Sequence, residues 1–505
     1  TNDTLPLITI LNSESSIKFY ECNFTFNDYS RNCRVLDLKD NAAVFDHCRF
    51  EKCGEDTIYL SKDSNEANPQ GTFEFTNNYV SSNEGTFINA AKIRSKPNIS
   101  GNTFVDSTIN NNYYIYISHN QNDIEFSNNT FSRIITTGTT ETECGIILNI
   151  IHHTNSEFSI KYIECNFYDI INHNTNSSYQ GGAIEYGYTN TNNFNVHLEM
   201  RGCEFKRNKV KQHGGAICIR TGKSVLIDNC EFDSNIANDA SSTSKLLFNN
   251  YYTDKTQGFG GAIYLTASFN SDNQDYSMSS VTISGCKFNN NQAYQGYAIY
   301  IEGDECSTTF ELDNNIFTNN HGTSDHSTLG GIISSEITHL DKYDIINNNE
   351  FSIETTEDNI EKFIHVDHLG TRLPDATETP SASPSELQAF INRTFVGSVG
   401  YDQAQAGVGI IQQISGCRFT NIHDTERNYY IKINKEIPIF DNIFENTELI
   451  TSGAKGGPLW SAFNGQLRLD NCKFIRISGK GGEGYVYTSN GQNTIHVTMN
   501  RCEFL

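Results

Sequence analysis

One nine-residue phrase recurs along the chain and constrains its fold more than any other feature. It reads "ISGCKFNNN" at 283–291, "MRGCEFKRN" at 200–208, "IDNCEFDSN" at 227–235 and "ISGCRFTNI" at 414–422. The underlying template, apolar-x-x-[Cys/Asn]-x-Phe, fits sixteen times, and its shortest spacings are 24 to 27 residues. A period of this length indicates a repeat architecture rather than one conventional core.

Two positions of the template are nearly constant. The last position is Phe in every copy but one, where Val80 replaces it. The position two residues earlier is Cys nine times and Asn six times, and Arg393 is the exception. We expect these positions to form a buried structural ladder, whose members include Cys203, Cys230, Cys286, Asn315, Cys472, Cys502, Phe205, Phe232, Phe288 and Phe317.

The apolar residues of the template change parity in its middle. In "VTISGCKF", Val281 and Ile283 alternate as in a strand, whereas Cys286 and Phe288 alternate on the opposite parity. A straight strand would reverse its buried face here. The residue at the change is usually Gly or Asn, which tolerate a left-handed backbone best. The pattern therefore predicts a one-residue corner between two short strands that both point inward.

A second phrase, "GGAI", alternates with the first and occurs at 181–184, 214–217 and 260–263. Paired glycines before apolar residues predict a tight turn that leads into another short strand. Each unit then holds about three strands, and it is too short for a helical crossover. The chain is predicted to coil on itself as an all-β parallel β-helix of about sixteen coils, a rod on the order of 75 Å long.

We expect one continuous β-helix over residues 1–505 with inserted loops. The intervals between repeats are longest where the segments near 236–259, 266–280 and 370–387 lie. The last of these is rich in Pro, Ser and Thr, a composition typical of exposed loops. Loops on a rigid scaffold commonly carry binding function, but these contain no pattern that predicts a ligand.

The alternation of GGAI with FxxN, which stands here at 205–208, 232–235 and 288–291, resembles the repeats of chlamydial polymorphic outer-membrane proteins and of related proteins of parasitic protists. The resemblance covers most of the chain and is clearest from about residue 165 to 335. It implies a right-handed β-helix with an adhesive or structural role, extracellular or on the cell surface. The motif is specific for the fold and weak for the function.

Three interpretations of the recurring cysteines are open. Catalysis or metal binding would need convergent partners, which a position repeated along an axis does not supply. Disulfides between stacked coils are the second, as between Cys203 and Cys230 or Cys472 and Cys502. The favoured interpretation is a small buried slot after a corner, where Cys acts as a compact hydrophobe and Asn bonds corner backbone groups. The remaining cysteines are candidates for one or two disulfides: Cys33, Cys53, Cys144, Cys218 and Cys306.

A carbohydrate-active β-helical enzyme, a polysaccharide lyase or hydrolase, is the alternative function. Such chemistry needs acids, or an acid with a base, on neighbouring coils. The candidate residues are Asp304, Glu305, His365, Asp367, His368, His152, His153 and Arg220. None recurs at matching positions, so we interpret them as solvated loop residues and Arg220 as a surface charge. We expect no catalytic residues, cofactor or metal.

Charge and composition limit the classes of partner that we expect the chain to bind. A formal net charge of -24 argues against nucleic acid and anionic membrane surfaces. The chain has no run of about 18 apolar residues, so direct membrane insertion is not expected. Glycans and host or neighbouring surface proteins are the expected partners. Glycosylation candidates for a secreted protein are Asn2, Asn23, Asn98, Asn128, Asn176 and Asn392.

The two ends of the sequence carry their own expectations. The chain begins "TNDTLPLITI", and we expect a secretion leader to have been removed or to lie outside this sequence. It ends in mid-unit with "NRCEFL", which suggests a piece of a longer protein or a stack that continues against a neighbour. Unpaired strand edges at open coils would favour end-to-end association into a filament.

Overall fold

The computed structural model divides the chain into two compact units, Thr1–Gly258 and Phe259–Leu505. The structure describes residues 8–10, 16–26, 35–39, 42–54, 56–61, 73–90, 97–109, 113–118, 123–136, 147–150, 157–172, 181–186, 196–220, 222–237, 258–266, 269–270, 275–276, 280–293, 296–306, 309–322, 333–339, 344–347, 349–352, 364–366, 411–415, 418–420, 423–424, 431–433, 438–440, 443–449, 459–461, 466–470, 472–479, 486–488 and 496–505.

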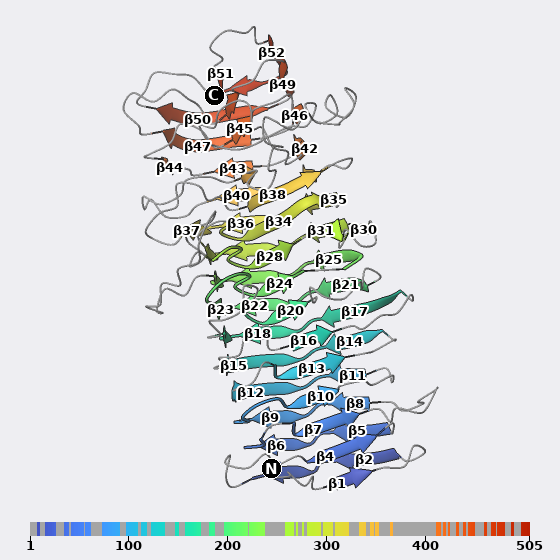
Figure 1. Cartoon of the computed structure of the whole chain (residues 1–505). Helices are drawn as coiled ribbons and strands as arrows, with labels where there is room; N and C mark the ends of the chain where they lie inside the picture. Colours follow the sequence, from blue (N-terminus) through green and yellow to red (C-terminus); the bar gives the residue numbers. More distant parts are fainter. Residues whose placement is uncertain are drawn as a thin grey trace, which may run out of the picture. The chain divides into compact units, whose positions relative to one another are not determined.

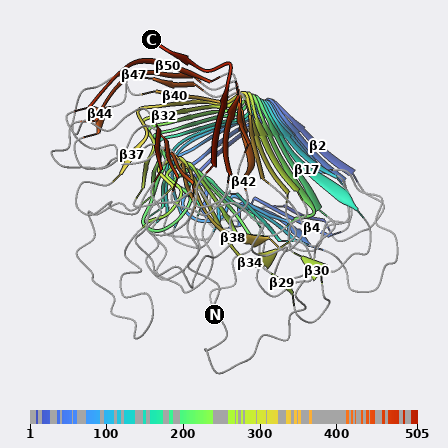
Figure 2. The same ribbon diagram turned by 90° about the horizontal axis from the view of Figure 1, so that it is seen from above.

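The first unit consists of three parallel sheets, to which each successive coil adds its strands (Figures 1 and 2). Sheet A contains β1 (Ile8–Ile10), β4 (Leu36–Lys39), β7 (Ile58–Ser61), β10 (Ile88–Ala90), β13 (Ile115–Ser118), β16 (Ile147–Ile150), β20 (Ile184–Tyr186) and β24 (Ile217–Ile219). Sheet B contains β2 (Ser16–Tyr20), β5 (Ala42–Asp46), β8 (Phe73–Thr76), β11 (Pro97–Ser100), β14 (Ile124–Ser127), β17 (Phe158–Ile163), β21 (Val196–Arg201) and β25 (Ser224–Asp228). Sheet C contains β3 (Asn23–Thr25), β6 (Arg49–Glu51), β9 (Tyr79–Ser81), β12 (Thr103–Ile109), β15 (Thr130–Thr136), β18 (Asn166–Tyr168), β19 (Ile171–Asn172), β22 (Glu204–Lys206), β23 (Lys209–Val210), β26 (Glu231–Asp233) and β27 (Ile236–Ala237).

The second unit repeats this arrangement. Its sheet A holds β28 (Ile263–Thr266), β34 (Ile299–Cys306), β38 (Ile333–His339) and β41 (Ile364–Val366). Its sheet B holds β31 (Ser280–Ser284), β35 (Thr309–Asp313), β39 (Asp344–Asn347), β42 (Ile411–Ser415), β46 (Pro438–Phe440), β49 (Gln466–Asp470) and β52 (His496–Asn500). Its sheet C holds β32 (Lys287–Asn289), β33 (Gln292–Ala293), β36 (Ile316–Thr318), β37 (His321–Gly322), β40 (Glu350–Ser352), β43 (Arg418–Thr420), β44 (His423–Asp424), β47 (Ile443–Leu449), β50 (Lys473–Gly479) and β53 (Glu503–Phe504). A further parallel sheet is formed by β45 (Ile431–Ile433), β48 (Leu459–Ser461) and β51 (Val486–Thr488).

The predicted fold class, an all-β parallel β-helix, is confirmed. Strands of successive coils pair in parallel and in register, as β14 does with β17 and β17 with β21. The predicted inserted segment at 266–280 contains β29 (Phe269–Asn270) and β30 (Asp275–Tyr276), which form a small antiparallel pair. Ile236 and Ala237 of the first predicted loop form β27, and 370–387 lies outside the described residues. One continuous β-helix over both units stays a prediction.

The interior of the first unit consists of residue columns that run from coil to coil. The template phenylalanines stack nearly face to face, with ring centroids 4.6 Å apart for Phe104 and Phe131, 5.1 Å for Phe131 and Phe167, 4.8 Å for Phe167 and Phe205, and 5.0 Å for Phe205 and Phe232. These separations match the spacing of neighbouring strands in a sheet. Each template aromatic therefore continues a column that the coil before it began.

A left-handed residue stands at the corner that the parity change predicted. Gly202 has a φ of 59° and Asn229 a φ of 51° in the first unit, and Gly285 has a φ of 61° in the second. The paired glycines form another corner. A Cβ on Gly214 (φ 67°) would lie 2.3 Å from the carbonyl oxygen of Ile217, so the position admits only glycine without rearrangement.

Candidate functional site

The template position that is Cys or Asn forms one continuous column in the first unit, which we call the first ladder. Its members there are Cys22, Cys48, Asn78, Asn102, Asn129, Cys165, Cys203 and Cys230. Asn102 illustrates the amide members. Its Oδ1 accepts hydrogen bonds from the backbone N–H (2.8 Å) and Nδ2 (3.1 Å) of Asn78 in the preceding coil. Its Nδ2 donates to the carbonyl of Phe75 at 2.6 Å, so the amide satisfies corner groups of the neighbouring coil.

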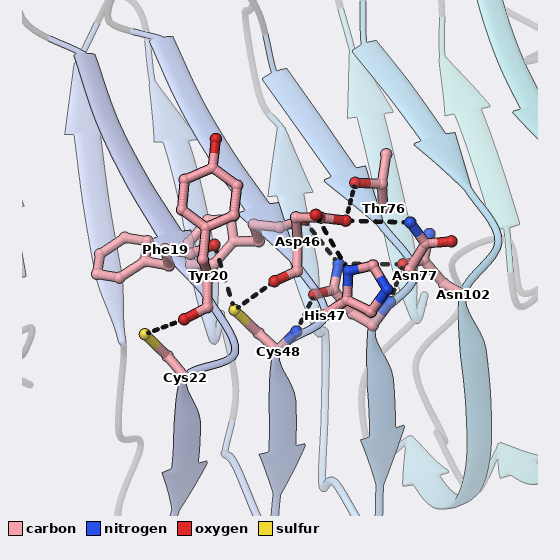
Figure 3. Close-up of polar contacts among 11 residues, drawn as sticks. Phe19, Tyr20, Cys22, Asp46, His47, Cys48, Thr76, Asn77 and Asn102 are labelled. Carbon is pink, nitrogen blue, oxygen red and sulfur yellow. Dashed lines mark hydrogen bonds and ion pairs between the residues drawn. The ribbon is translucent and has the colours of Figure 1, made fainter.

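The cysteines of the first ladder repeat the donor contact, and Cys165 Sγ also accepts a long hydrogen bond, 3.9 Å, from Asn129 Nδ2. The Cys203 thiol donates to the carbonyl of Tyr162 at 3.3 Å, and the Cys165 thiol to that of Phe126 at 3.3 Å. These carbonyls occupy the place that Phe75 has relative to Asn102, three residues before the ladder residue of the preceding coil. Figure 3 shows the same contact from Cys48 to Phe19. The interpretation of the ladder cysteines as compact hydrophobes is therefore incomplete, because their thiols also donate hydrogen bonds.

Burial makes the ladder thiols poor nucleophiles. It is the main cause of the raised pKa of Cys48 and of the strongly raised pKa of Cys165. A hydrogen bond with Cys165 lowers the pKa of Cys203, but the bond with Cys230 and burial outweigh it and raise that pKa overall. Cys203 and Cys230 are not joined by a disulfide, nor are Cys472 and Cys502. Thiols in such surroundings are structural rather than catalytic.

A second ladder was not identified as such in the sequence, although the FxxN motif marks it. It lies five residues after the first and includes Cys53, Asn83, Asn208 and Asn235 in the first unit. Asn235 Oδ1 accepts from the backbone N–H of Asn208 at 3.1 Å and from its Nδ2 at 2.9 Å. Cys53, a predicted disulfide candidate, is a thiol in this column, and its backbone N–H donates to Asn83 Oδ1 at 2.8 Å. Cys and Asn thus each occur at both corner positions.

In the second unit the first ladder and the phenylalanine column recur. Cys286 donates its backbone N–H to Asn315 Oδ1 at 2.9 Å, and Asn315 N–H donates to Asn349 Oδ1 at 2.9 Å. The rings of Phe288 and Phe317 stack at 4.8 Å, and those of Phe474 and Phe504 at 5.0 Å. Cys472 is buried and Cys502 is partly exposed.

The structure corrects the interpretation of Arg220 as a surface charge. It is only 4% exposed and forms an ion pair with Glu185, whose side chain is 0% exposed. Glu185 lies on β20, and Arg220 follows β24 in the next coil, so sheet pairing brings together two residues that are 35 positions apart. Removing either partner of a buried pair leaves an uncompensated charge, which is costly.

Most of the other proposed catalytic residues lie where the structure gives no side-chain description. His152, His153, Asp367 and His368 lie outside the described residues. The strands β34 and β41 contain Asp304, Glu305 and His365, whose side chains are not described. Cys33 and Cys144 also lie outside, the Cys306 side chain is not described, and Cys218 is a buried thiol.

Charged residues line the outside of the second corner in the first unit. Asp106, Arg133, Asp169 and Arg207 occupy it in successive coils, all with positive φ. Arg133 binds Asp106 through two hydrogen bonds of 2.6 and 2.9 Å, and Arg207 binds Asp169 through two of 2.6 and 2.8 Å. These bonds lower the pKa of both carboxyls. The acid–base alternation ties neighbouring coils together at the surface.

A smaller polar cluster lies at the first corner, near the start of the unit (Figure 3). Asp46 accepts hydrogen bonds from Asn77 Nδ2 at 3.0 Å and Thr76 Oγ1 at 2.8 Å, and its other oxygen lies 3.1 Å from Nδ1 of His47. The bonds from Asn77 and Thr76 are the main causes of the lowered pKa of Asp46. All of its partners come from the same or the next coil, so the cluster fastens adjacent corners.

The outer face of sheet A carries a group of tyrosines and polar residues that we call the tyrosine face: Asp37, Asp56, Tyr59, Asn89, Tyr113 and Tyr116. Asp37, Tyr59, Asn89 and Tyr116 are register partners on β4, β7, β10 and β13. All four are half-buried, whereas the strand neighbours whose side chains are described are buried in the core. Asn89 Nδ2 donates to Asp56 Oδ1 at 2.7 Å, and the rings of Tyr113 and Tyr116 stack at 5.4 Å. The arrangement combines aromatic surfaces with fixed hydrogen-bonding groups.

Three of the predicted glycosylation sites are described, and all three are exposed. Asn23 lies on β3, Asn98 on β11, and Asn128 at a corner with a φ of 53°. Asn2, Asn176 and Asn392 lie outside the described residues.

The described residues show neither a membrane-spanning helix nor a metal-binding cluster. They contain no helix of sufficient length and hydrophobicity to cross a membrane. Within the same residues, no group of three or more His, Cys, Asp or Glu side chains is arranged to hold a metal ion.

Comparisons with known proteins give structural likeness only. No protein-family model matches the chain, and no curated protein matches it. Among solved structures, it is similar to the catalytic unit of a thermostable GH87 alpha-1,3-glucanase from Streptomyces thermodiastaticus strain HF3-3, at 7% identity and a TM-score of 0.30. That match covers 96% of this chain but 62% of the glucanase chain. A mutant of the PL6 family alginate lyase AlyGC matches at 8% identity and a TM-score of 0.14, with 97% of each chain covered.

Proposed function

We propose that the chain is an extracellular structural or adhesive β-helical protein, displayed on a cell surface or secreted. The observation that carries this proposal is the structural role of the repeated residues inside the coils. In the described coils between the first and the last, the recurring Cys, Asn and Phe side chains whose burial is described are buried in ladders that bond or stack on a neighbouring coil. The repeat thus specifies a scaffold, and the outer columns remain for recognition.

Localisation and adhesion test this proposal directly. An antibody against the chain should label intact cells of the source organism, and the purified protein on a surface should retain those or neighbouring cells. Labelling only after permeabilisation would contradict the surface location. Turnover of a polysaccharide that is abolished by a single Asp or Glu substitution would favour the enzyme alternative instead.

End-to-end self-association is part of the same proposal. Strand edges that are unpaired at the end of a coil stack are natural templates for pairing with another copy. Negative-stain electron microscopy of the purified chain over a concentration series should show particles that lengthen with concentration. Particles of one constant length at every concentration would contradict association.

A further inference from the structure

We propose that the tyrosine face of the first unit binds a neutral oligosaccharide. This inference rests on the proposed adhesive function and names its ligand class. The face offers the two chemistries that recognise sugars. Tyrosine rings present rigid apolar surfaces with a polar hydroxyl, suited to the C–H faces of a pyranose. Carboxylates beside them can accept hydrogen bonds from sugar hydroxyls.

The spacing on the face fits an extended chain molecule. Tyr59 and Tyr116 are in the same column, separated by one coil that contributes Asn89. Two strand spacings place the two tyrosines about 9.6 Å apart along the stack. A linear oligosaccharide lying along this column would meet an aromatic ring, an amide and a second aromatic ring in turn.

The face is also fixed before any ligand arrives. Asn89 is held by its hydrogen bond to Asp56, and Tyr116 is held by stacking on Tyr113. The strands beneath are anchored by fully buried neighbours, such as Ile88 and Ala90 around Asn89. Groups that are already ordered lose little conformational entropy on binding, which favours affinity.

The negative charge of the tyrosine face and of the whole chain favours one class of sugar. Asp37 and Asp56 give the face two carboxylates, and the chain has a formal net charge of -24. Acidic polysaccharides would be repelled by this field. A neutral oligosaccharide meets no such repulsion, and its hydroxyls can donate to the carboxylates.

Titration calorimetry of the whole chain tests the proposal. The probes are cellohexaose, chitohexaose and xylohexaose as neutral ligands and hexagalacturonate as the acidic one. At least one neutral hexasaccharide should bind with a micromolar to millimolar dissociation constant. The double variant Tyr59→Ala with Tyr116→Ala should weaken that binding by about tenfold or more, equivalent to about 1.4 kcal/mol.

Tyr79→Ala is the matched control. Tyr79 is likewise a half-buried tyrosine on an outer face, but it belongs to sheet C, where its ring lies under Arg49. Its variant should bind the sugar as the wild type does. Hydrogen exchange of the wild type supplies a measurement that needs no variant, because the ligand should slow exchange in 56–61 and 113–118.

Three results would overturn the inference. They are the absence of binding by every neutral probe, a preference for hexagalacturonate, and equal loss of binding in the Tyr79→Ala control. None of them would by itself contradict the adhesive function. Cell retention by the purified protein would then show that another surface mediates adhesion, whereas loss of both would contradict the function and the inference together.

Discussion

Two stretches of the first ladder occupy the same corner of the first unit with different chemistry. In the amide segment, Asn78, Asn102 and Asn129 each donate to a backbone carbonyl of the preceding coil and accept from a backbone N–H of that same coil. In the thiol segment, Cys165 and Cys203 donate to the equivalent carbonyl. The comparison teaches that both residue types supply a small donor for the carbonyl of the preceding coil, and that the amide adds a short acceptor bond where the thiol makes only a long one.

The thiol segment has more links of another kind between its coils. Arg201 pairs with Asp228, Lys206 with Glu231, and Arg207 with Asp169, each across one coil boundary. The buried pair of Glu185 and Arg220 joins two coils of the same region. In this segment the first ladder contains no side-chain amides, and charge pairs between its described coils are more numerous.

The largest expected effect comes from breaking the buried charge pair of the thiol segment. Arg220→Met should lower the free energy of unfolding of the first unit by about 3–5 kcal/mol, because it leaves the Glu185 carboxylate buried without its guanidinium. Urea denaturation followed by circular dichroism measures the loss. The double variant Glu185→Leu with Arg220→Met should recover most of it, and a double variant as unstable as the single one would contradict the pairing.

The second-largest effect is expected when the acceptor and donor groups of Asn102, in the amide segment, are removed together. Asn102→Ala should cost about 2–4 kcal/mol, because the Asn78 N–H and the Phe75 carbonyl lose their partner in a buried site. Asn102→Cys should cost less, since a thiol can still donate to the Phe75 carbonyl. Native-state hydrogen exchange around β8 and β11 reports the local free energy. Equal costs for the two variants would show that the donor has no role.

A smaller effect is expected when an amide replaces a thiol in the thiol segment. Cys203→Asn should change the free energy of unfolding by less than about 1 kcal/mol, because Asn78 already follows Cys48 and accepts from its backbone N–H at 2.8 Å. Cys203→Ala, which loses the donor and leaves a small cavity, should cost about 1–2 kcal/mol. Thermal unfolding of the three proteins ranks them, and an Asn variant less stable than the Ala variant would contradict the common slot.

The smallest expected effect concerns the exposed acid–base pairs at the second corner. The pKa values of Asp106 and Asp169 are lowered in the folded state, mainly by Arg133 and Arg207. A lowered pKa adds stability above the unfolded-state value near 4, and this is lost as pH falls through the folded-state value. Since both pairs are largely exposed, Arg207→Met should cost only about 0.2–1 kcal/mol at neutral pH. The cost should vanish at acidic pH and shrink in high salt; a cost independent of pH would point to lost packing.

Much of the architecture follows from the repeat itself. The parity change around Gly285 predicted a corner, and the glycine has the left-handed φ that such a corner needs. The second corner carried no comparable signal, because Arg133, Asp169 and Arg207 take positive φ without being Gly or Asn. Side chains of this kind tolerate a left-handed backbone less readily than Gly or Asn, so their identity does not mark a corner. FxxN was visible as a motif, yet its role as a second ladder depended on the hydrogen bonds of the folded coils.

The sequence by itself determined that the chain forms repeating β-coils, where each first corner lies, and which residues stack inside, since these depend on period and parity within one repeat. Only the tertiary structure decided which residues of different coils meet. The repeats are separated by insertions of unequal length, so linear spacing does not give the register between coils. For this reason the pair of Glu185 and Arg220, the acid–base alternation and the tyrosine face became apparent only after parallel pairing had aligned the coils.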